Sequence, residues 1–197
     1  QNIDSSFYRA KIDSLELLYG AHKQIPKAYK LEILLALSYF PELKDRKITF
    51  KTAKIKTTLN ARPTVGSLLF RKRENRRYIV RINTTKKKGR VLMPDVPFNA
   101  RIGLLGHEFC HFVDYDHKHL GGVLNRLFAY LGAKSKEHFE KEIDQLTIEK
   151  GLGWQLYAWS YYVLNDSKAS DAYKAFKAKI YLEPEEILEI MKANKTY

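Results

Sequence analysis

The feature that most constrains this chain is the run His107-Glu108-Phe109-Cys110-His111, which lies in a segment with helical spacing of apolar residues. Residues four apart share one face of a helix, so the imidazoles of His107 and His111 point the same way. Both can bind one tetrahedral Zn²⁺, and Glu108 can accept a proton from a water molecule on that metal. The alternative, a pair of core histidines, needs two buried hydrogen-bond partners. The uncharged flanking residues, 104–106 and 112–113, favour the metal.

A catalytic zinc site normally has three protein ligands and one open position, so one ligand remains to be found. We predict Glu140, because Glu140 and Asp144 are spaced to share one face of a later helix. Glu140 then binds the metal, and Asp144 accepts a hydrogen bond from the far ring nitrogen of a ligating histidine. The predicted site is therefore one Zn²⁺ held by His107, His111 and Glu140, with Glu108 as the catalytic base.

Two other residues compete with Glu140 for the role of third ligand. His117 stands six residues after His111, at the place of the third ligand in an H-E-x-x-H-x-x-G-x-x-H site. That geometry needs the chain to leave the helix sharply, and the position of the glycine that permits the turn holds Asp114. Glu142 is a further choice, but it points about 200° away from Glu140 around a helix. We therefore favour Glu140.

The hydrophobic pattern divides the chain into a mixed first half and a helical second half. Helical spacing predicts helices at 12–19 and 27–39, and again at 99–116, 122–131, 136–164 with a break at 151–153, 170–179 and 184–192. Alternating spacing between them predicts a small, mostly antiparallel sheet with a turn at 86–89 and strands at 47–59, 65–71, 77–83 and 91–93. We predict an α+β fold in one domain, 1–197, with a basic helix-and-sheet half, 1–96, and a helical metal-site half, 97–197.

The charge of the chain is concentrated in its first half. The net charge is +13, and the segment from Arg71 to Arg90 holds ten basic residues against one acidic residue, Glu74. Such a cluster can attract nucleic acid, an anionic surface or an acidic substrate, although a solvated strand face is the more ordinary interpretation. The alternative function is therefore a nucleic-acid or anionic-surface binding module in which the metal is only structural.

Composition restricts the class of protein further. A single cysteine, Cys110, excludes an intramolecular disulfide framework and a multi-cysteine zinc ribbon. The longest apolar stretches, 31–40 and 154–164, are shorter than the ~18–20 residues of a membrane-spanning helix, so we expect no transmembrane segment. The chain opens with Gln1 and has no basic-then-apolar leader, which favours an exported protein, periplasmic or secreted, whose leader has been removed.

The two motifs, His107-Glu108-x-x-His111 and Glu140-x-x-x-Asp144, resemble those of the zincin metallopeptidases and, within them, the gluzincin branch. Three longer segments, 36–43, 107–115 and 151–159, are similar to a group of uncharacterised bacterial zinc metallopeptidases. The resemblance implies a zincin-like fold, in which an edge strand of the sheet aligns an extended peptide above the zinc. The two ligand-bearing helices lie beneath, and the strand at 91–93 or at 77–83 supplies the edge.

The resemblance also implies the reaction, a hydrolysis of a peptide or protein substrate by a zinc-bound water that Glu108 activates. Many relatives add a His, Tyr or Arg that binds the oxyanion. No His or Arg follows Asp144 in this sequence. A partner from that region is therefore a tyrosine, such as Tyr157, Tyr161 or Tyr162, or a lysine.

Overall fold

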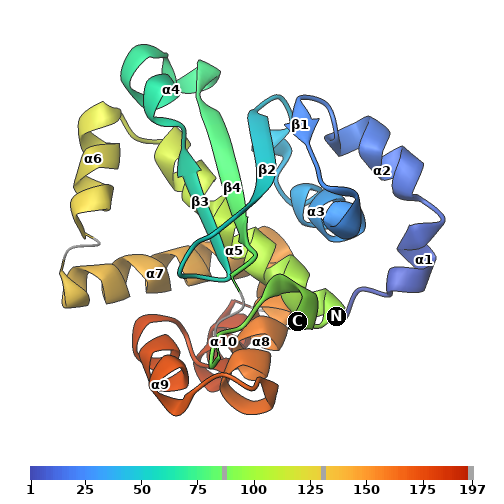
Figure 1. The fold of residues 1–197 in the computed structure, drawn as a ribbon, viewed down its shortest axis with the longest axis vertical. Helices are drawn as coiled ribbons and strands as arrows, with labels where there is room; N and C mark the ends of the chain where they lie inside the picture. The colour runs from blue at the N-terminus through green and yellow to red at the C-terminus, as the bar shows by residue number, and fades with distance from the viewer. Residues whose placement is uncertain (86–87, 130–131, 195–197) are drawn as a thin grey trace.

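The computed structural model describes residues 1–85, 88–129 and 132–194. These residues form a four-stranded sheet in the order β1 (Lys23–Gln24), β2 (Lys47–Ala53), β4 (Arg77–Asn83) and β3 (Leu59–Pro63) (Figure 1). Strand β2 runs parallel to both β1 and β4, whereas β3 runs antiparallel to β4. The α+β class is confirmed, but the prediction of a mostly antiparallel sheet is wrong.

Between β3 and β4 the chain forms a helix where a strand was predicted. Strand β2 is parallel to β4 because the chain reverses direction between β2 and β3 and again between β3 and β4. Residues 65–71, predicted as a strand, form the helix α4 (Val65–Phe70) instead. From the sequence alone, a short apolar run fits a strand or a helix equally well. The Ser67 hydroxyl holds the helix in place, because it donates to the Thr64 carbonyl and accepts from the Arg77 N–H, each at 3.0 Å.

Two other strand predictions also need correction. The strand expected at 47–59 is divided into β2 and β3, with residues 54–58 between them. Residues 91–93 form no strand, because the Val91 carbonyl accepts a hydrogen bond from the Thr58 hydroxyl at 2.9 Å and a 3₁₀ turn begins at Met93. Pro94 has no N–H to donate to a neighbouring strand. The turn predicted at 86–89 lies partly outside the described residues.

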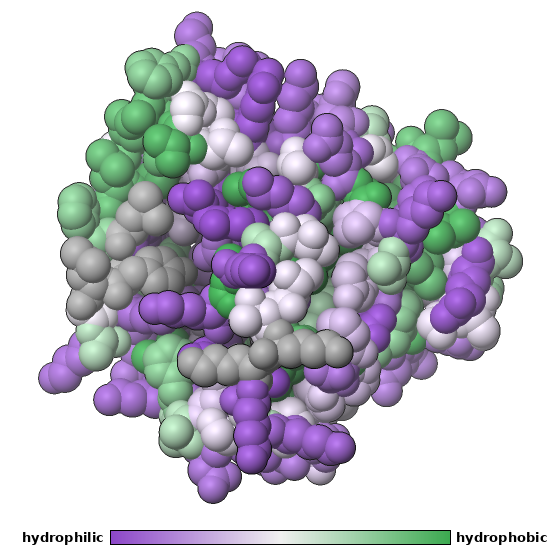
Figure 2. Space-filling view, viewed as in Figure 1, coloured by the Kyte–Doolittle hydropathy of each residue, from purple (hydrophilic) through white to green (hydrophobic). Residues whose placement is uncertain are grey.

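Alternation along the strands gives the sheet two unlike faces. The inner face packs on the helix α5 (Phe98–Asp116) through buried apolar side chains, namely Ile48, Phe50, Leu59, Tyr78, Val80 and Ile82. No helix lies over the outer face in Figure 1, and Figure 2 shows a largely hydrophilic surface on this side. This outer face carries five basic residues, Lys47, Lys51, Arg62, Arg77 and Arg81. A sheet packed on one side and wet on the other is what period-two alternation predicts.

Helix α5 lies at the centre of the described chain, and α3, α7 and α8 pack against it. The bounds of the other helices are α1 (Ser5–Arg9), α2 (Ile12–Tyr19), α3 (Lys30–Leu37), α6 (Leu120–Ala129), α7 (Ala133–Thr147), α8 (Gly153–Tyr161), α9 (Asp171–Ile180) and α10 (Pro184–Ala193). The predicted helices are thus confirmed within a few residues, except that the end predicted at 131 lies outside the described residues. Gly151, with a φ of 86°, makes the predicted break between α7 and α8. None of the described helices is long and apolar enough to cross a membrane.

The backbones of α5 and α8 approach each other closely at Gly103. A Cβ atom added at this position would lie 2.0 Å from the carbonyl oxygen of Gln155. Real non-bonded atoms do not come so close, so a side chain here would push α8 away from α5. The contact matters for the site described below because α5 carries both histidines.

We expect Gly103→Ala to lower the free energy of unfolding by about 1–3 kcal/mol or more, as overpacked cores do. Urea denaturation followed by circular dichroism measures the change. Gly121→Ala in α6 is the matched control, because nothing lies within 4 Å of its added Cβ. Alanine is favoured over glycine in a helix, so the control should keep or slightly raise stability. Equal stability of the two variants would contradict the close contact.

Candidate metal centre

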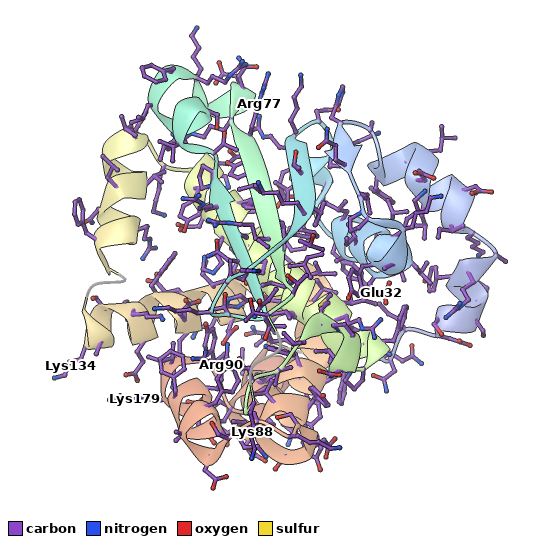
Figure 3. All side chains as sticks on the ribbon, viewed as in Figure 1. Glu32, Arg77, Lys88, Arg90, Lys134 and Lys179 are labelled. Atoms are coloured by element: carbon purple, nitrogen blue, oxygen red, sulfur yellow. The ribbon has the colours of Figure 1, made fainter. Side chains whose placement is uncertain are left out.

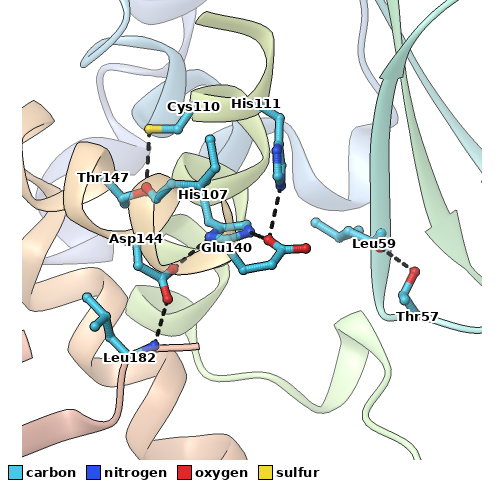
Figure 4. A network of polar contacts seen from close by, with 10 residues as sticks. Thr57, Leu59, His107, Cys110, His111, Glu140, Asp144, Thr147 and Leu182 are labelled. Atoms are coloured by element: carbon cyan, nitrogen blue, oxygen red, sulfur yellow. Dashed lines mark hydrogen bonds and ion pairs between the residues drawn. The ribbon is translucent and has the colours of Figure 1, made fainter. Parts of the chain in front are cut away.

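Two helices bring three potential metal ligands together (Figure 4). His107 and His111 lie one turn apart on α5, and Glu140 lies on α7. Nε2 of His107 is 3.1 Å from Oε2 of Glu140, and Nε2 of His111 is 3.4 Å from the same oxygen. All three side chains are buried, and one ligand atom from each lies within 4.8 Å of the others, so the group could hold a metal ion.

The spacing of these atoms fits a small tetrahedral ion. Metal–ligand bonds of about 2.1 Å place the corners of a tetrahedron about 3.4 Å apart. The two distances from Oε2 of Glu140, 3.1 Å and 3.4 Å, are close to this value. Two imidazole nitrogens and one carboxylate oxygen also leave a fourth position open, as catalytic sites do. These two spacings are therefore compatible with a metal ion held by nitrogen and oxygen ligands.

Asp144 contacts His107 at the ring nitrogen that does not face Glu140. Its Oδ1 lies 2.7 Å from Nδ1 of His107, and its Oδ2 accepts a hydrogen bond from the backbone N–H of Leu182 at 2.9 Å. An aspartate is an acceptor, so this contact keeps the proton on Nδ1 and leaves Nε2 to face Glu140. The same carboxylate also ties the connection between α9 and α10 to α7.

The charges around His107 favour a cation at this place. Burial alone would lower the pKa of His107, but Asp144 and Glu140 outweigh it and raise the pKa to about 10. Burial raises the pKa of Glu140, yet hydrogen bonds from His107 and His111 hold it well below its usual value. Two buried carboxylates thus favour a positive charge at the ring of His107. A metal ion held by His107, His111 and Glu140 would supply positive charge at the same place.

The competing ligands lie elsewhere. Helix α5 continues through Asp114 to Asp116, so the sharp turn that would bring His117 to the metal is missing, and His117 caps the end of the helix. Asp114 instead forms ion pairs with Lys118 and Arg126. Glu142 pairs with Arg126 at 2.7 Å and with His138 at 3.2 Å. Neither His117 nor Glu142 belongs to the metal-binding group found among the described residues.

Cys110, between the two histidines in the sequence, is part of the core. It is fully buried, and the Thr147 hydroxyl lies 3.3 Å from its sulfur. Burial raises the pKa of the Cys110 thiol to about 12, so it stays protonated at neutral pH. Cys110 therefore fills space between α5 and α7 as a small core residue.

The three ligand side chains and Glu108 open on one cavity of about 210 Å³. Strand β3 and the residues before it, 57–62, form one wall. The edge of the sheet at the cavity is therefore β3, and the prediction of an edge at 77–83 or 91–93 is wrong, because β4 lies between β2 and β3. Sequence analysis did not separate β3 from β2, because both begin within the alternating segment predicted as one strand at 47–59.

Tyr181 lies at the candidate site, and sequence analysis missed it. It lines the cavity, and its ring centre is 5.5 Å from that of His107. Lys177 and Trp159 line the same cavity, whereas Tyr157, Tyr161 and Tyr162 do not. No local pattern separates Tyr181 from the other tyrosines, because the Asp144 contact with Leu182 is what brings it to the site.

Comparisons with known proteins add no family to this picture. No protein-family model matches the chain, and no curated protein or solved structure is detectably similar to it. The resemblance to the gluzincins therefore stays a prediction that rests on the motif residues.

The metal group predicts how single substitutions change metal content. Purified wild type should retain about one equivalent of metal, and Glu140→Gln should lose most of it, since a carboxylate ligand is replaced by a weaker amide. Elemental analysis after identical washing measures the metal. Glu142→Gln, two residues away on the same helix, and His117→Ala are matched controls that should keep the metal. Loss of metal from His117→Ala, with Glu140→Gln unchanged, would contradict the assignment.

Proposed function

We propose that this chain is a zinc-dependent hydrolase of the gluzincin type, a metallopeptidase that cleaves extended peptides. One observation carries the proposal. The buried group His107, His111 and Glu140, which could hold a metal ion, opens on the same cavity as Glu108 and the sheet edge β3. A Zn²⁺ ion bound by this group supplies a Lewis acid that polarises a carbonyl group and lowers the pKa of water.

Strand β3 would position the substrate. One of its edges pairs with β4, and the other lies along the cavity, so its backbone groups there can pair with an added strand. A peptide that binds in this way is extended, with its carbonyl groups held in a fixed register. This geometry favours a peptide over a compact small molecule as the substrate.

Glu108 would move the proton. Glu108 follows the proposed ligand His107 in the sequence and lines the cavity. Only 9% of its surface is exposed, and a substrate bound in the cavity would cover that exposed part. Its carboxylate accepts the proton from the attacking water and delivers it to the nitrogen of the leaving amine. The scissile C–N bond breaks as that nitrogen becomes neutral, which closes the proton balance of the reaction.

Tyr181 would bind the negative oxygen that develops on the attacked carbonyl. Burial, together with Glu140, Glu108 and Asp144, raises the pKa of its hydroxyl well above the usual value. The hydroxyl therefore keeps its proton at neutral pH and can act as a donor. A fixed donor of this kind stabilises a transition state more than a ground state.

Glu108→Gln tests the proposed base. The amide cannot accept the proton, so we expect kcat to fall by about 10²–10⁴-fold, while the metal content stays at the wild-type level. Release of amines from a mixed peptide library, together with elemental analysis, measures both quantities. Unchanged turnover in a variant that keeps its metal would refute the role of Glu108.

Tyr181→Phe tests the proposed oxyanion donor. The ring and its packing against His107 remain, so KM should stay nearly constant while kcat falls by about 10²–10³-fold. Tyr157→Phe is the matched control, because Tyr157 stacks on Tyr161 outside the cavity. An equal effect of the two substitutions on kcat would contradict the assignment.

A further inference from the structure

The outer face of the sheet places positive charges next to one another. In the register of β2 and β4, Lys47 lies opposite Arg77 and Lys51 lies opposite Arg81. On β3, Arg62 lies opposite Ile79, which stands between Arg77 and Arg81 on the outer face of β4. Like charges directly across a sheet lower stability. Figure 3 shows Arg77 at one end of this face and Arg90 beyond the other.

No carboxylate compensates these charges within the described chain. The remaining outward positions of the three strands hold only uncharged residues, namely Thr49, Ala53, Asn60, Ile79 and Asn83. Other cations of the protein do have acidic partners, for example Arg46 with Asp116 and Arg101 with Glu32. The Nε atom of Arg81 is buried without a hydrogen-bond partner. The cations of this face therefore have no acidic counter-charge among the described residues.

The positive charge continues from this face into the cavity. Arg62 belongs to both, because it lies on the outer face and lines the cavity beside β3. Lys177 lines the cavity from α9, and its Nζ lies 4.0 Å from the centre of the Tyr181 ring. The carboxylates that line the cavity are Glu108 and Glu140, which belong to the metal site. Lys136 lines the cavity from α7, so anionic groups of a ligand would meet cations from three separate elements.

We propose that the ligand of this cavity is an acidic peptide segment, whose carboxylates are bound by Arg62 on β3 and Lys177 on α9. The inference rests on the proposed function, since it names the substrate class of the same site. Arg62 stands on the strand that would pair with the peptide, so it selects a side chain next to the paired backbone. Arg81, beside it, adds positive charge. Lys177, on the opposite element, selects a second acidic side chain.

The face favours a peptide over a nucleic acid for a structural reason. Single-stranded nucleic acids bind on aromatic side chains that stack with the bases, and the described outward positions of the three strands include none. Duplex recognition uses an element that projects into a groove, whereas these cations lie on the flat side of a sheet. An acidic peptide needs only an extended edge and cations beside it, and both are present.

The test measures binding separately from cleavage. Metal-loaded Glu108→Gln is titrated with a fluorescent peptide that carries two glutamates, and with the same peptide carrying two glutamines, by fluorescence anisotropy. We expect the acidic peptide to bind about tenfold more tightly at low salt, and the difference to shrink as salt rises. Equal affinities for the two peptides would overturn the proposal.

Variants in the Glu108→Gln background locate the contacts. Arg62→Gln and Lys177→Gln should each weaken binding of the acidic peptide about threefold, as partly exposed ion pairs do, and leave the glutamine peptide unchanged. Lys192→Gln, on α10 outside the cavity, removes the same charge and should have no effect. Arg62→Glu should prefer a peptide with lysines, an exchange that a purely structural role of Arg62 would not produce.

Two further outcomes separate this inference from the proposed function. If the protein with Glu108 intact cleaves no peptide but Arg62 still controls binding of the acidic one, the recognition stands and the hydrolase proposal fails. If cleavage occurs with no preference for acidic peptides, the hydrolase stands and the recognition fails. Tighter binding of a DNA duplex than of the acidic peptide, with dependence on Arg62, would also overturn the proposal in favour of nucleic acid.

Discussion

Two buried carboxylates on α7, Glu140 and Asp144, set the requirement that the rest of the site satisfies. A buried carboxylate is costly unless it is paired, and here both are directed at the ring of His107. Their negative charge can be balanced by a doubly protonated His107 imidazole, or by a neutral imidazole together with a bound metal ion. Either way a positive charge must stand between the helices, which explains why the group is buried and still polar.

The packing of the helices serves this requirement. Gly103 lets α8 lie against α5, and the turn at Gly151 sends the chain from α7 into α8. Arg126 of α6 lies over the Phe139 ring at 4.4 Å and pairs with Glu142, which holds the outer side of α7 while its inner side meets the histidines. The ligands are therefore fixed by two rigid helices, so a metal would find them already close to its preferred spacing.

Charge is arranged differently on the two walls of the cavity. At the metal site, the negative charges of Glu140 and Asp144 are balanced by the adjacent histidines and the proposed metal ion. The sheet side is basic and has no internal compensation among the described residues, as Arg62 and Arg81 show. Because the two sides meet at β3, one ligand can engage both, with its backbone along the strand and its acidic side chains on the cations.

Local periodicity determined much of this protein. The helix that carries His107 and His111, the helix that carries Glu140 and Asp144, and the shared face within each pair follow from spacing along one element. Tertiary structure alone decided that these helices lie side by side, that α4 is a helix, that β2 and β4 are parallel, and that β3 and Tyr181 line the cavity. The reason is physical: a short apolar run suits a strand or a helix equally, and pairing between distant segments depends on long-range packing that no local pattern contains.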